Sequence, residues 1–327
     1  MRSLRAIACC LVAFALIVLF DSCPTEPAYS STITPIYAAT DDGLFVYNGS
    51  SWTQYSTSLP SSASSHLASN TARSVVVSGS GSQADIYVGT GSGVSHFDGS
   101  SWKNWSASDG LGTGTVNQLF LTSSDLYAAT SSSLSFYNYD GISPVWNTNS
   151  SISAINAFSV YGTYIYVAAG SLYVYNGTSL QVTLDVAQYV PGSTKATSIL
   201  PLSSQETLVG TDKGFNLLYS TSGGSNYSSW STAVTKTGTV YGFALDASDN
   251  VYIACDAGIY ELVYSNSSLV QINATKASCV AVDGKGTIYA GTGSGLLVSR
   301  NSGATWSNIL ANHVVNSVAA TAPLYSF

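Results

Sequence analysis

The sequence predicts an all-β fold, a seven-bladed β-propeller of four-stranded antiparallel blades. Three observations predict it. A strand motif of the form aliphatic-Tyr-small-small-Thr occurs seven times, a second motif of small, polar, small and aliphatic residues also occurs seven times, and successive copies of the second motif lie 37 to 44 residues apart. That period is typical of a four-stranded propeller blade. The composition agrees, because Tyr, Val and Thr suit pleated surfaces and only 8% of the 327 residues are charged.

The first element in the chain is a predicted signal peptide, residues 1–22. Arg2 and Arg5 precede an uncharged apolar run, residues 6–20, which is too short to span a bilayer and suits a secretion signal. Cys23 follows this run and resembles the lipidated first residue of bacterial lipoproteins, although Phe20 and Asp21 replace the Leu and the small residue that such signals usually carry. We therefore expect lipidation at Cys23, with residues 23–31 as an anchor and linker; a simple secreted protein and an uncleaved anchor are the alternatives.

The remaining charge excludes one class of partner. Residues 1–22 hold two of the ten basic and one of the 17 acidic residues, so the mature chain has eight basic and sixteen acidic residues and a net charge of −8. Because phosphate binding needs a basic surface, nucleic acid is not an expected partner.

Cys255 and Cys279 also remain in the mature chain. Either they form one disulfide, or each is a small buried residue within a strand.

The blades follow, from residue 32 to residue 327. The second strands of the blades begin at Ile36, Ile86, Leu126, Ile165, Thr207, Val251 and Ile288, and a turn and a third strand follow each. The first strands begin at Ala72, Val116, Ile155, Ala196, Val240, Ala277 and Val315. The chain therefore starts its repeats at a second strand and ends with an unpartnered first strand, Val315–Ala320. We expect this segment to pair beside Ile36–Thr40 and close the ring, which removes exposed sheet edges. The segment 323–327 has no assigned place.

Each third strand leads through a hairpin into a fourth strand. Asn48-Gly49 and Asp98-Gly99 predict two-residue turns with positive φ, and Asp140-Gly141, Asn176-Gly177 and Ser302-Gly303 occupy the same place in other repeats. A tryptophan follows most of these turns, at positions 52, 102, 146, 230 and 306. We expect these rings to lie on the outermost strands and to pack over the gaps between neighbouring blades. A platform on which sugars stack is the alternative.

The repeats resemble the propeller repeats in the sensor regions of two-component regulators, over residues 32 to 322. The resemblance implies a sensing or binding module. Those sensors are attached to a transmembrane helix and a kinase, which this sequence does not contain, so a catalytic signalling output is not expected. The segment Ser299–Trp306 also resembles the Asp-box turn of sialidase-type propellers, with Asn301 in place of Asp. Sialidases need three arginines for their substrate, and the mature chain contains only Arg73 and Arg300.

Few residues are arranged for chemistry. His66, His96 and His313 have no spacing that suits a metal site, and we expect each to be a surface or loop residue. Asp246 and Asp249 lie in a predicted hairpin and build a turn, or less favourably form part of a calcium site. The sequence predicts no catalytic residues, no metal and no cofactor.

Polar residues are expected around one mouth of the central channel. They are the second residues of the first strands and the turns between second and third strands: Arg73, Asn117, Asn156, Thr197, Tyr241, Ser278, Asn316, Asp41, Asp42, Asp212, Lys213 and Asp256. Arg73 is the only guanidinium among them and is the preferred contact for an anionic or carbonyl group. In the alternative interpretation, these side chains only satisfy backbone groups or channel water.

Together these features predict a monomeric, non-catalytic binding or scaffold module in the bacterial cell envelope, at the outer membrane or facing the periplasm, or a secreted protein if Cys23 is not lipidated. The expected partner is a protein or a small polar or glycan ligand. The alternative is a carbohydrate-active enzyme, a lyase or a glycoside hydrolase, that uses an Asp and Tyr241 at the channel mouth. The sequence offers no closely spaced acid and base for that chemistry.

Overall fold

The protein is described by a computed structural model, which covers residues 34–61, 65–79, 84–138, 145–220, 227–229, 233–263 and 268–320. Thr34–Phe327 form one compact unit. The predicted signal peptide, Cys23 with the following linker, Asp140-Gly141, Trp230 and residues 323–327 lie outside the described residues. Within the described ranges, no helix has the length and the apolar character that crossing a membrane requires.

The fold contains seven four-stranded antiparallel sheets, as the sequence predicts, and we number them in chain order. The first sheet has the order β28 (Val315–Ala320), β1 (Ile36–Thr40), β2 (Gly43–Tyr47), β3 (Trp52–Tyr55). The second has β4 (Ala72–Ser78), β5 (Asp85–Thr90), β6 (Gly93–Phe97), β7 (Trp102–Trp105), and the third has β8 (Val116–Leu121), β9 (Asp125–Thr130), β10 (Leu134–Asn138), β11 (Trp146–Asn149). The fourth has β12 (Ala157–Tyr161), β13 (Tyr164–Ala168), β14 (Leu172–Asn176), β15 (Ser179–Leu184).

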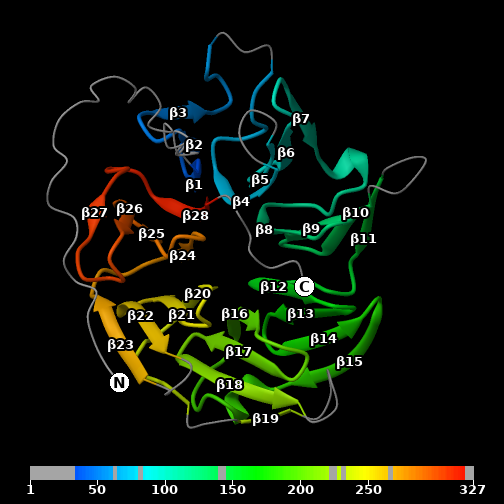
Figure 1. Ribbon diagram of the computed structural model, residues 1–327. Coiled ribbons are helices and arrows are strands. Elements are labelled where there is room, and N and C mark those ends of the chain that lie inside the picture. The colour runs from blue at the N-terminus through cyan, green and yellow to red at the C-terminus, as the bar shows by residue number, and fades with distance from the viewer. Residues whose placement is uncertain are drawn as a thin grey trace, which may run out of the picture. The chain divides into compact units, whose positions relative to one another are not determined.

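The fifth sheet has β16 (Ala196–Pro201), β17 (Glu206–Thr211), β18 (Gly214–Ser220), β19 (Tyr227–Ser229). The sixth has β20 (Val240–Leu245), β21 (Val251–Cys255), β22 (Gly258–Val263), β23 (Ser268–Asn273), and the seventh has β24 (Cys279–Val282), β25 (Ile288–Thr292), β26 (Gly295–Ser299), β27 (Ser307–Asn308). Two short 3-10 helices, η2 (Ala107–Asp109) and η3 (Val186–Gln188), follow β7 and β15. Figure 1 shows the sheets around a common centre, with the first strand of each sheet innermost.

The ring is closed by the last strand of the chain. β28 pairs with β1 in antiparallel register, with Ile36 opposite Ala320 and Ala38 opposite Val318. β28 also contacts the inner strands β4 and β24 of the two neighbouring sheets. The predicted closure is therefore confirmed, and the inner edge of the first sheet is covered by the C-terminal end of the same chain.

In four sheets, the Thr that ends the second strand closes the following turn with its side chain. The hydroxyl groups of Thr40, Thr90, Thr211 and Thr292 each donate to the carbonyl oxygen three residues later, at 2.8–3.0 Å. That acceptor is a glycine with positive φ in all four turns. A Cβ on Gly43 would lie 2.1 Å from the carbonyl oxygen of Tyr55, so no other residue fits there. This explains why the Thr and the Gly recur in the motif.

The hairpins at Asn48-Gly49 and Asp98-Gly99 differ from the prediction. Tyr47 pairs with Trp52, so the loop has four residues, 48–51, instead of two. Only Gly49 in this loop has positive φ, and the Asn48 side chain accepts hydrogen bonds from the N–H groups of Ser50 and Ser51 at 3.0 and 2.9 Å. The prediction of a two-residue turn is wrong here because Asn48 closes the loop with its side chain as an Asx turn. In the fourth sheet, Asn176 pairs with Ser179, so that loop has two residues.

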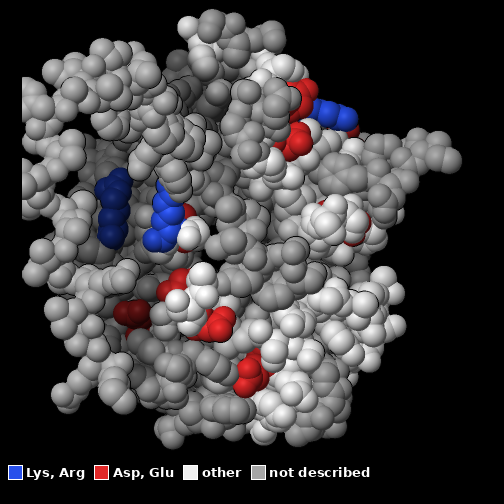
Figure 2. Space-filling model, viewed as in Figure 1, with Lys and Arg blue, Asp and Glu red and all other residues white. Residues whose placement is uncertain are grey.

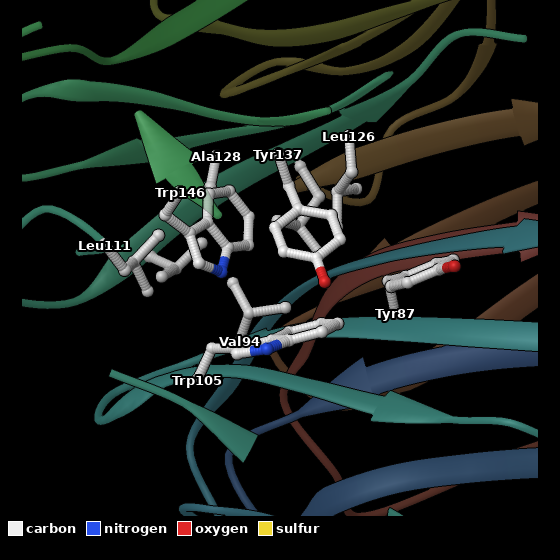
Figure 3. Close-up of a cluster of buried hydrophobic side chains, with 10 residues drawn as sticks. Tyr87, Val94, Trp105, Leu111, Leu126, Ala128, Tyr137 and Trp146 are labelled. Atoms are coloured by element: carbon white, nitrogen blue, oxygen red, sulfur yellow. The ribbon is translucent and has the colours of Figure 1, made fainter. Parts of the chain in front are cut away.

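The tryptophans fill the gaps between sheets, as predicted. Trp102 is buried in a cluster with residues of the first and second sheets, and the Trp52 Nε1 donates to the Ile309 carbonyl at 2.8 Å. Figure 3 shows Trp105 of the second sheet beside Tyr137 and Trp146 of the third. Trp105 and Trp146 meet edge to face, with ring centroids 5.9 Å apart.

Cys255 and Cys279 are free thiols, and burial raises the pKa of the Cys279 thiol to about 12.

Candidate functional site

The first strands carry their predicted polar residues on β-bulges. The strand register shifts at Arg73, Asn117, Thr197, Tyr241 and Asn316, so each of these residues has no partner on the adjacent second strand. Asn156 and Ser278 lie one residue before β12 and β24. A bulge redirects a side chain out of the regular alternation of a strand. We call the redirected side chains and the turns beside them the mouth of the ring.

Four of the seven redirected side chains bind the backbone of the next sheet. Their hydrogen bonds are Asn156 Nδ2 to Ala196 O at 2.7 Å, Thr197 Oγ1 to Val240 O at 2.6 Å, Ser278 Oγ to Val315 O at 2.5 Å and Asn316 Nδ2 to Ala72 O at 2.9 Å. Each acceptor is the first residue of the inner strand in the neighbouring sheet. These side chains therefore hold adjacent sheets together, which is the alternative that the sequence left open.

The third residue of the same motif joins sheets as well. The Ser74 Oγ accepts from the Leu119 N–H at 2.9 Å, and the Ser317 Oγ accepts from the Val75 N–H at 3.4 Å. Gln118 bonds to both backbone groups of Phe158, accepting from its N–H at 2.7 Å and donating to its carbonyl at 3.0 Å. The inner strands are thus connected by side chains that the sequence motif contains but that sequence reasoning did not assign.

Arg73 forms a cluster at the seam where the first and second sheets meet. Its Nη1 lies 3.6 Å from the Asp41 Oδ1 and donates to the Asn316 Oδ1 at 3.3 Å. The Asn316 Nδ2 donates to the same Asp41 oxygen at 2.9 Å. The Arg73 and Asp41 side chains are 43% and 44% exposed. Within the described part of the chain, the other two guanidinium nitrogens have no hydrogen-bond partner. We call these three residues the seam cluster.

Asp42 lies next to the seam cluster and contacts a histidine. Its Oδ2 is 2.8 Å from the His313 Nδ1, and the His313 ring packs on Phe45 with centroids 4.5 Å apart. His313 is in a loop, as predicted. His96 is not: it lies in β6, stacked between Tyr87 and Trp105, so the prediction that it is a surface or loop residue is wrong.

A second cluster joins the sixth and seventh sheets. The Tyr241 hydroxyl donates to the Asp256 Oδ1 at 2.9 Å, and the Lys276 Nζ lies 2.7 Å from the same oxygen and 2.9 Å from the Tyr241 hydroxyl. Burial raises the pKa of Asp256, but hydrogen bonds from Lys276, Thr239 and Tyr241 outweigh it and hold that pKa well below its usual range. Hydrogen bonds to Asp256 and Tyr241 raise the pKa of Lys276. The pair is therefore ionised at neutral pH.

The remaining predicted residues have simpler surroundings. Asp212 accepts from the Thr194 N–H at 2.9 Å and from its hydroxyl at 2.7 Å, which fixes the loop before β16. Burial raises the pKa of Asp212, but these bonds dominate and lower it. Asn117 and Lys213 are exposed and make no side-chain hydrogen bond or ion pair with another described residue. Among the described residues in view in Figure 2, the charged side chains are scattered and not gathered into one patch.

The Asp246 turn is built by its own hydrogen bonds. Asp246 Oδ1 accepts from the N–H groups of Ser248 and Asn250 at 2.8 and 2.9 Å, and its Oδ2 accepts from the Asn250 amide and the Tyr252 hydroxyl. The turn-building role predicted for Asp246 is therefore confirmed. Across the part of the chain that the structure describes, no three His, Cys, Asp or Glu side chains converge as metal ligands do.

Comparisons with known proteins identify the fold. No protein-family model matches the sequence, and no curated protein matches it. The extracellular domain of a hybrid two-component system from B. thetaiotaomicron superposes with a TM-score of 0.66 at 16% identity, over 82% of this chain and 39% of that one. A second such domain from the same organism gives 0.62 at 19% identity, over 75% and 35%. The WD40 β-propeller domain of Doa1 gives 0.60 at 11% identity, over 79% and 86%.

These likenesses establish the propeller fold and no more, because the sequences are less than one-fifth identical. The chain spans little more than a third of the length of the two extracellular domains that it matches.

Proposed function

We propose that the protein is an exported, non-catalytic, sensor-like binding module that is held at the bacterial cell envelope by lipid on Cys23 and binds a ligand at the mouth of the ring. The apolar run before Cys23 supports export. The likeness in fold to extracellular domains of two-component systems supports a sensing role. The proposal assigns residues 1–22 to the signal peptide, 23–31 to the anchor and linker, and 32–327 to the propeller.

One observation carries the binding site: two guanidinium nitrogens of Arg73 in the seam cluster have no hydrogen-bond partner among the described residues. Asp41 and Asn316 hold one nitrogen of Arg73 and thereby orient the planar group. The two remaining nitrogens suit a carboxylate or carbonyl oxygen, since guanidinium groups bind such oxygens in a two-pronged manner. A small polar or glycan ligand that carries an acidic group fits this chemistry best.

Calorimetric titration tests the binding site. We would titrate the chain from residue 24 onward with trigalacturonic acid and with maltotriose, its neutral counterpart in size. Wild type should bind the acidic trisaccharide at least tenfold more tightly than the neutral one, and Arg73→Ala should lose that preference. Arg300→Ala, which removes the other arginine of the mature chain, should leave binding unchanged. Equal binding by wild type and Arg73→Ala would refute the proposed role of Arg73.

Metabolic labelling tests the anchor. Cells that express the full chain and receive labelled palmitate should mark the wild type and leave Cys23→Ala unmarked, with Cys255→Ala as the control cysteine. Equal label on wild type and Cys23→Ala would remove the lipid anchor from the proposal and leave a secreted protein.

A further inference from the structure

The gap between the first and second sheets shows what normally fills the outer space between blades. Trp102 is 7% exposed and packs in one buried cluster. The same cluster contains Tyr37 and Leu44 of the first sheet and Ile86 of the second, with Val46, Tyr55 and Phe97 packed against it. The Trp102 ring lies 5.6 Å from the Tyr55 ring and 5.1 Å from the Phe97 ring, measured between centroids.

The gap between the third and fourth sheets lacks this ring. In each of the first three sheets, a tryptophan of the outermost strand pairs with an aromatic residue of the neighbouring third strand. The corresponding position of the fourth sheet holds a leucine. The pairs are Tyr47 with Trp52, Phe97 with Trp102, Tyr137 with Trp146, and Tyr175 with Leu180. Leu180 is 51% exposed and belongs to none of the buried clusters among the described residues. It therefore does not fill the space that Trp102 fills in the first gap.

A cavity of about 140 Å³ occupies that space. Its walls include Tyr127, Leu134, Phe136 and Asn149 of the third sheet and Ile165 of the fourth. By position in their strands, these residues correspond in order to Tyr37, Leu44, Val46, Tyr55 and Ile86 of the first gap. The cavity is thus lined by the same set of positions that surrounds Trp102.

We propose that this cavity is a binding site for a small aromatic molecule of about the size of indole. The protein places an indole on the same set of positions in the first gap, which defines the shape that fits. A dry cavity of about 150 Å³ with aliphatic and aromatic walls is large enough to hold benzene. Tyr127 and Phe136, with ring centroids 6.3 Å apart, provide aromatic faces and edges for a further ring. The site lies between two sheets and uses none of the mouth residues, so it is independent of the function proposed above.

Fluorine NMR with 5-fluoroindole tests the site. Wild type should bind the probe saturably, and Leu180→Trp, which places an indole in the cavity, should weaken binding at least tenfold. Leu180→Ala leaves the cavity open and should bind within about threefold of wild type. Absence of saturable binding to wild type, or undiminished binding to a folded Leu180→Trp, would overturn the proposal. Equal binding of the saturated ring 4-fluorocyclohexanol would overturn the aromatic preference.

A measurement on the wild type alone keeps the proposal testable if Leu180→Trp does not fold. Methyl resonances of Leu134, Ile152 and Ile165, which line the cavity, should shift when indole is added. Methyl resonances of Leu44 and Ile86, which pack around Trp102, should stay in place. Shifts at the second pair without shifts at the first three would overturn the assignment.

Discussion

The gap filled by Trp102 and the gap beside Leu180 share one backbone plan and differ in how they are held. The first gap is packed on its outer side by an indole ring, and the third-to-fourth gap has a cavity of about 140 Å³ there. Both pairs of sheets nevertheless keep the same register between second and third strands, and only the fourth strand of the fourth sheet is shifted by a bulge. The outer ring is therefore a filler that stabilises the gap and does not set the arrangement of the blades.

Polar side chains join the inner strands in both gaps. In the third-to-fourth gap, Gln118 bonds to both backbone groups of Phe158. In the first gap, the Ser317 hydroxyl accepts one long bond from Val75, Asn316 donates one to Ala72, and the exposed Arg73 contacts both Asn316 and Asp41. The gap without an indole thus has a two-bond connection from a single side chain near the axis. Polar contacts of the inner strands position the blades, and apolar rings add stability outside them.

Removal of the closing strand should break the first gap most severely. Deletion of Val315–Phe327 removes β28, including Ser317 and its hydrogen bond to Val75, and it also exposes the edge of β1. We expect a loss that approaches the whole stability of a domain, about 5 kcal/mol or more. Thermal unfolding followed by circular dichroism measures it, and a chain that ends at residue 322 isolates the contribution of β28. An unchanged melting temperature would contradict the role assigned to closure.

Trp102→Leu should make the first gap resemble the other one. Loss of most of a buried indole leaves a cavity, and we expect a cost of about 2–4 kcal/mol in the free energy of unfolding. Leu180→Ala is the matched control and should cost less than about 1 kcal/mol, since that side chain is half exposed. Urea denaturation measures both. Equal losses of stability from the two substitutions would show that Trp102 stabilises its gap no more than Leu180 stabilises the other.

Gln118→Ala should weaken the inner side of the third-to-fourth gap. The substitution leaves the N–H and carbonyl of Phe158 without this partner, and we expect a cost of about 1–3 kcal/mol. Ser317→Ala removes a single 3.4 Å bond from the first gap and should cost about 1 kcal/mol or less. If Ser317→Ala proved the more damaging change, the two-bond connection of Gln118 would not be the stronger of the two contacts.

The same comparison shows why the fold could be predicted and the site only in part. The sheets and their closure follow from residues that the backbone geometry requires, such as Thr40 and Gly43, and these recur in the sequence. The mouth residues recur too, but position does not reveal their partners. Asn156 and Asn117 are both asparagines at the second position of the motif, yet only Asn156 reaches the next sheet among the described contacts. The reach depends on the placement of the neighbouring sheet, which the sequence does not specify.

Lys276 and the cavity differ in how the sequence encodes them. Lys276 lies in a loop outside both repeated motifs, so nothing in the repeat associated it with Tyr241 and Asp256. The cavity has a signal in the sequence: no tryptophan follows Asn176-Gly177, whereas one follows Asn48-Gly49 and Asp98-Gly99. The absence of a residue from a repeat is informative only once the structure shows what that residue packs against.

Leu180→Trp should make the third-to-fourth gap resemble the first one. An indole at this position would occupy the cavity, and we expect a gain of about 1 kcal/mol in the free energy of unfolding, as cavity-filling substitutions commonly give. The same urea titration measures it. A loss of stability would mean that the fourth strand of this sheet, in which Gln181 is an extra residue opposite Val174 and Tyr175, does not direct the side chain into the cavity.

The smallest expected effect concerns a gap that charge helps to hold. Lys276 and Asp256 join the seventh and sixth sheets, and their side chains are 60% and 39% exposed, so the pair contributes at most about 1 kcal/mol. Because its partners hold the pKa of Asp256 below the ordinary value, this contribution is present at neutral pH and is lost as the pH falls below that value. The stability difference between wild type and Asp256→Asn should therefore shrink in acid. The difference between wild type and Trp102→Leu should stay constant over the same pH range, because no proton binds to the indole. Urea titrations between pH 7 and pH 3 measure both stability differences. If both changed with pH in the same way, the proposed distinction between a gap held by charge and a gap held by packing would be wrong.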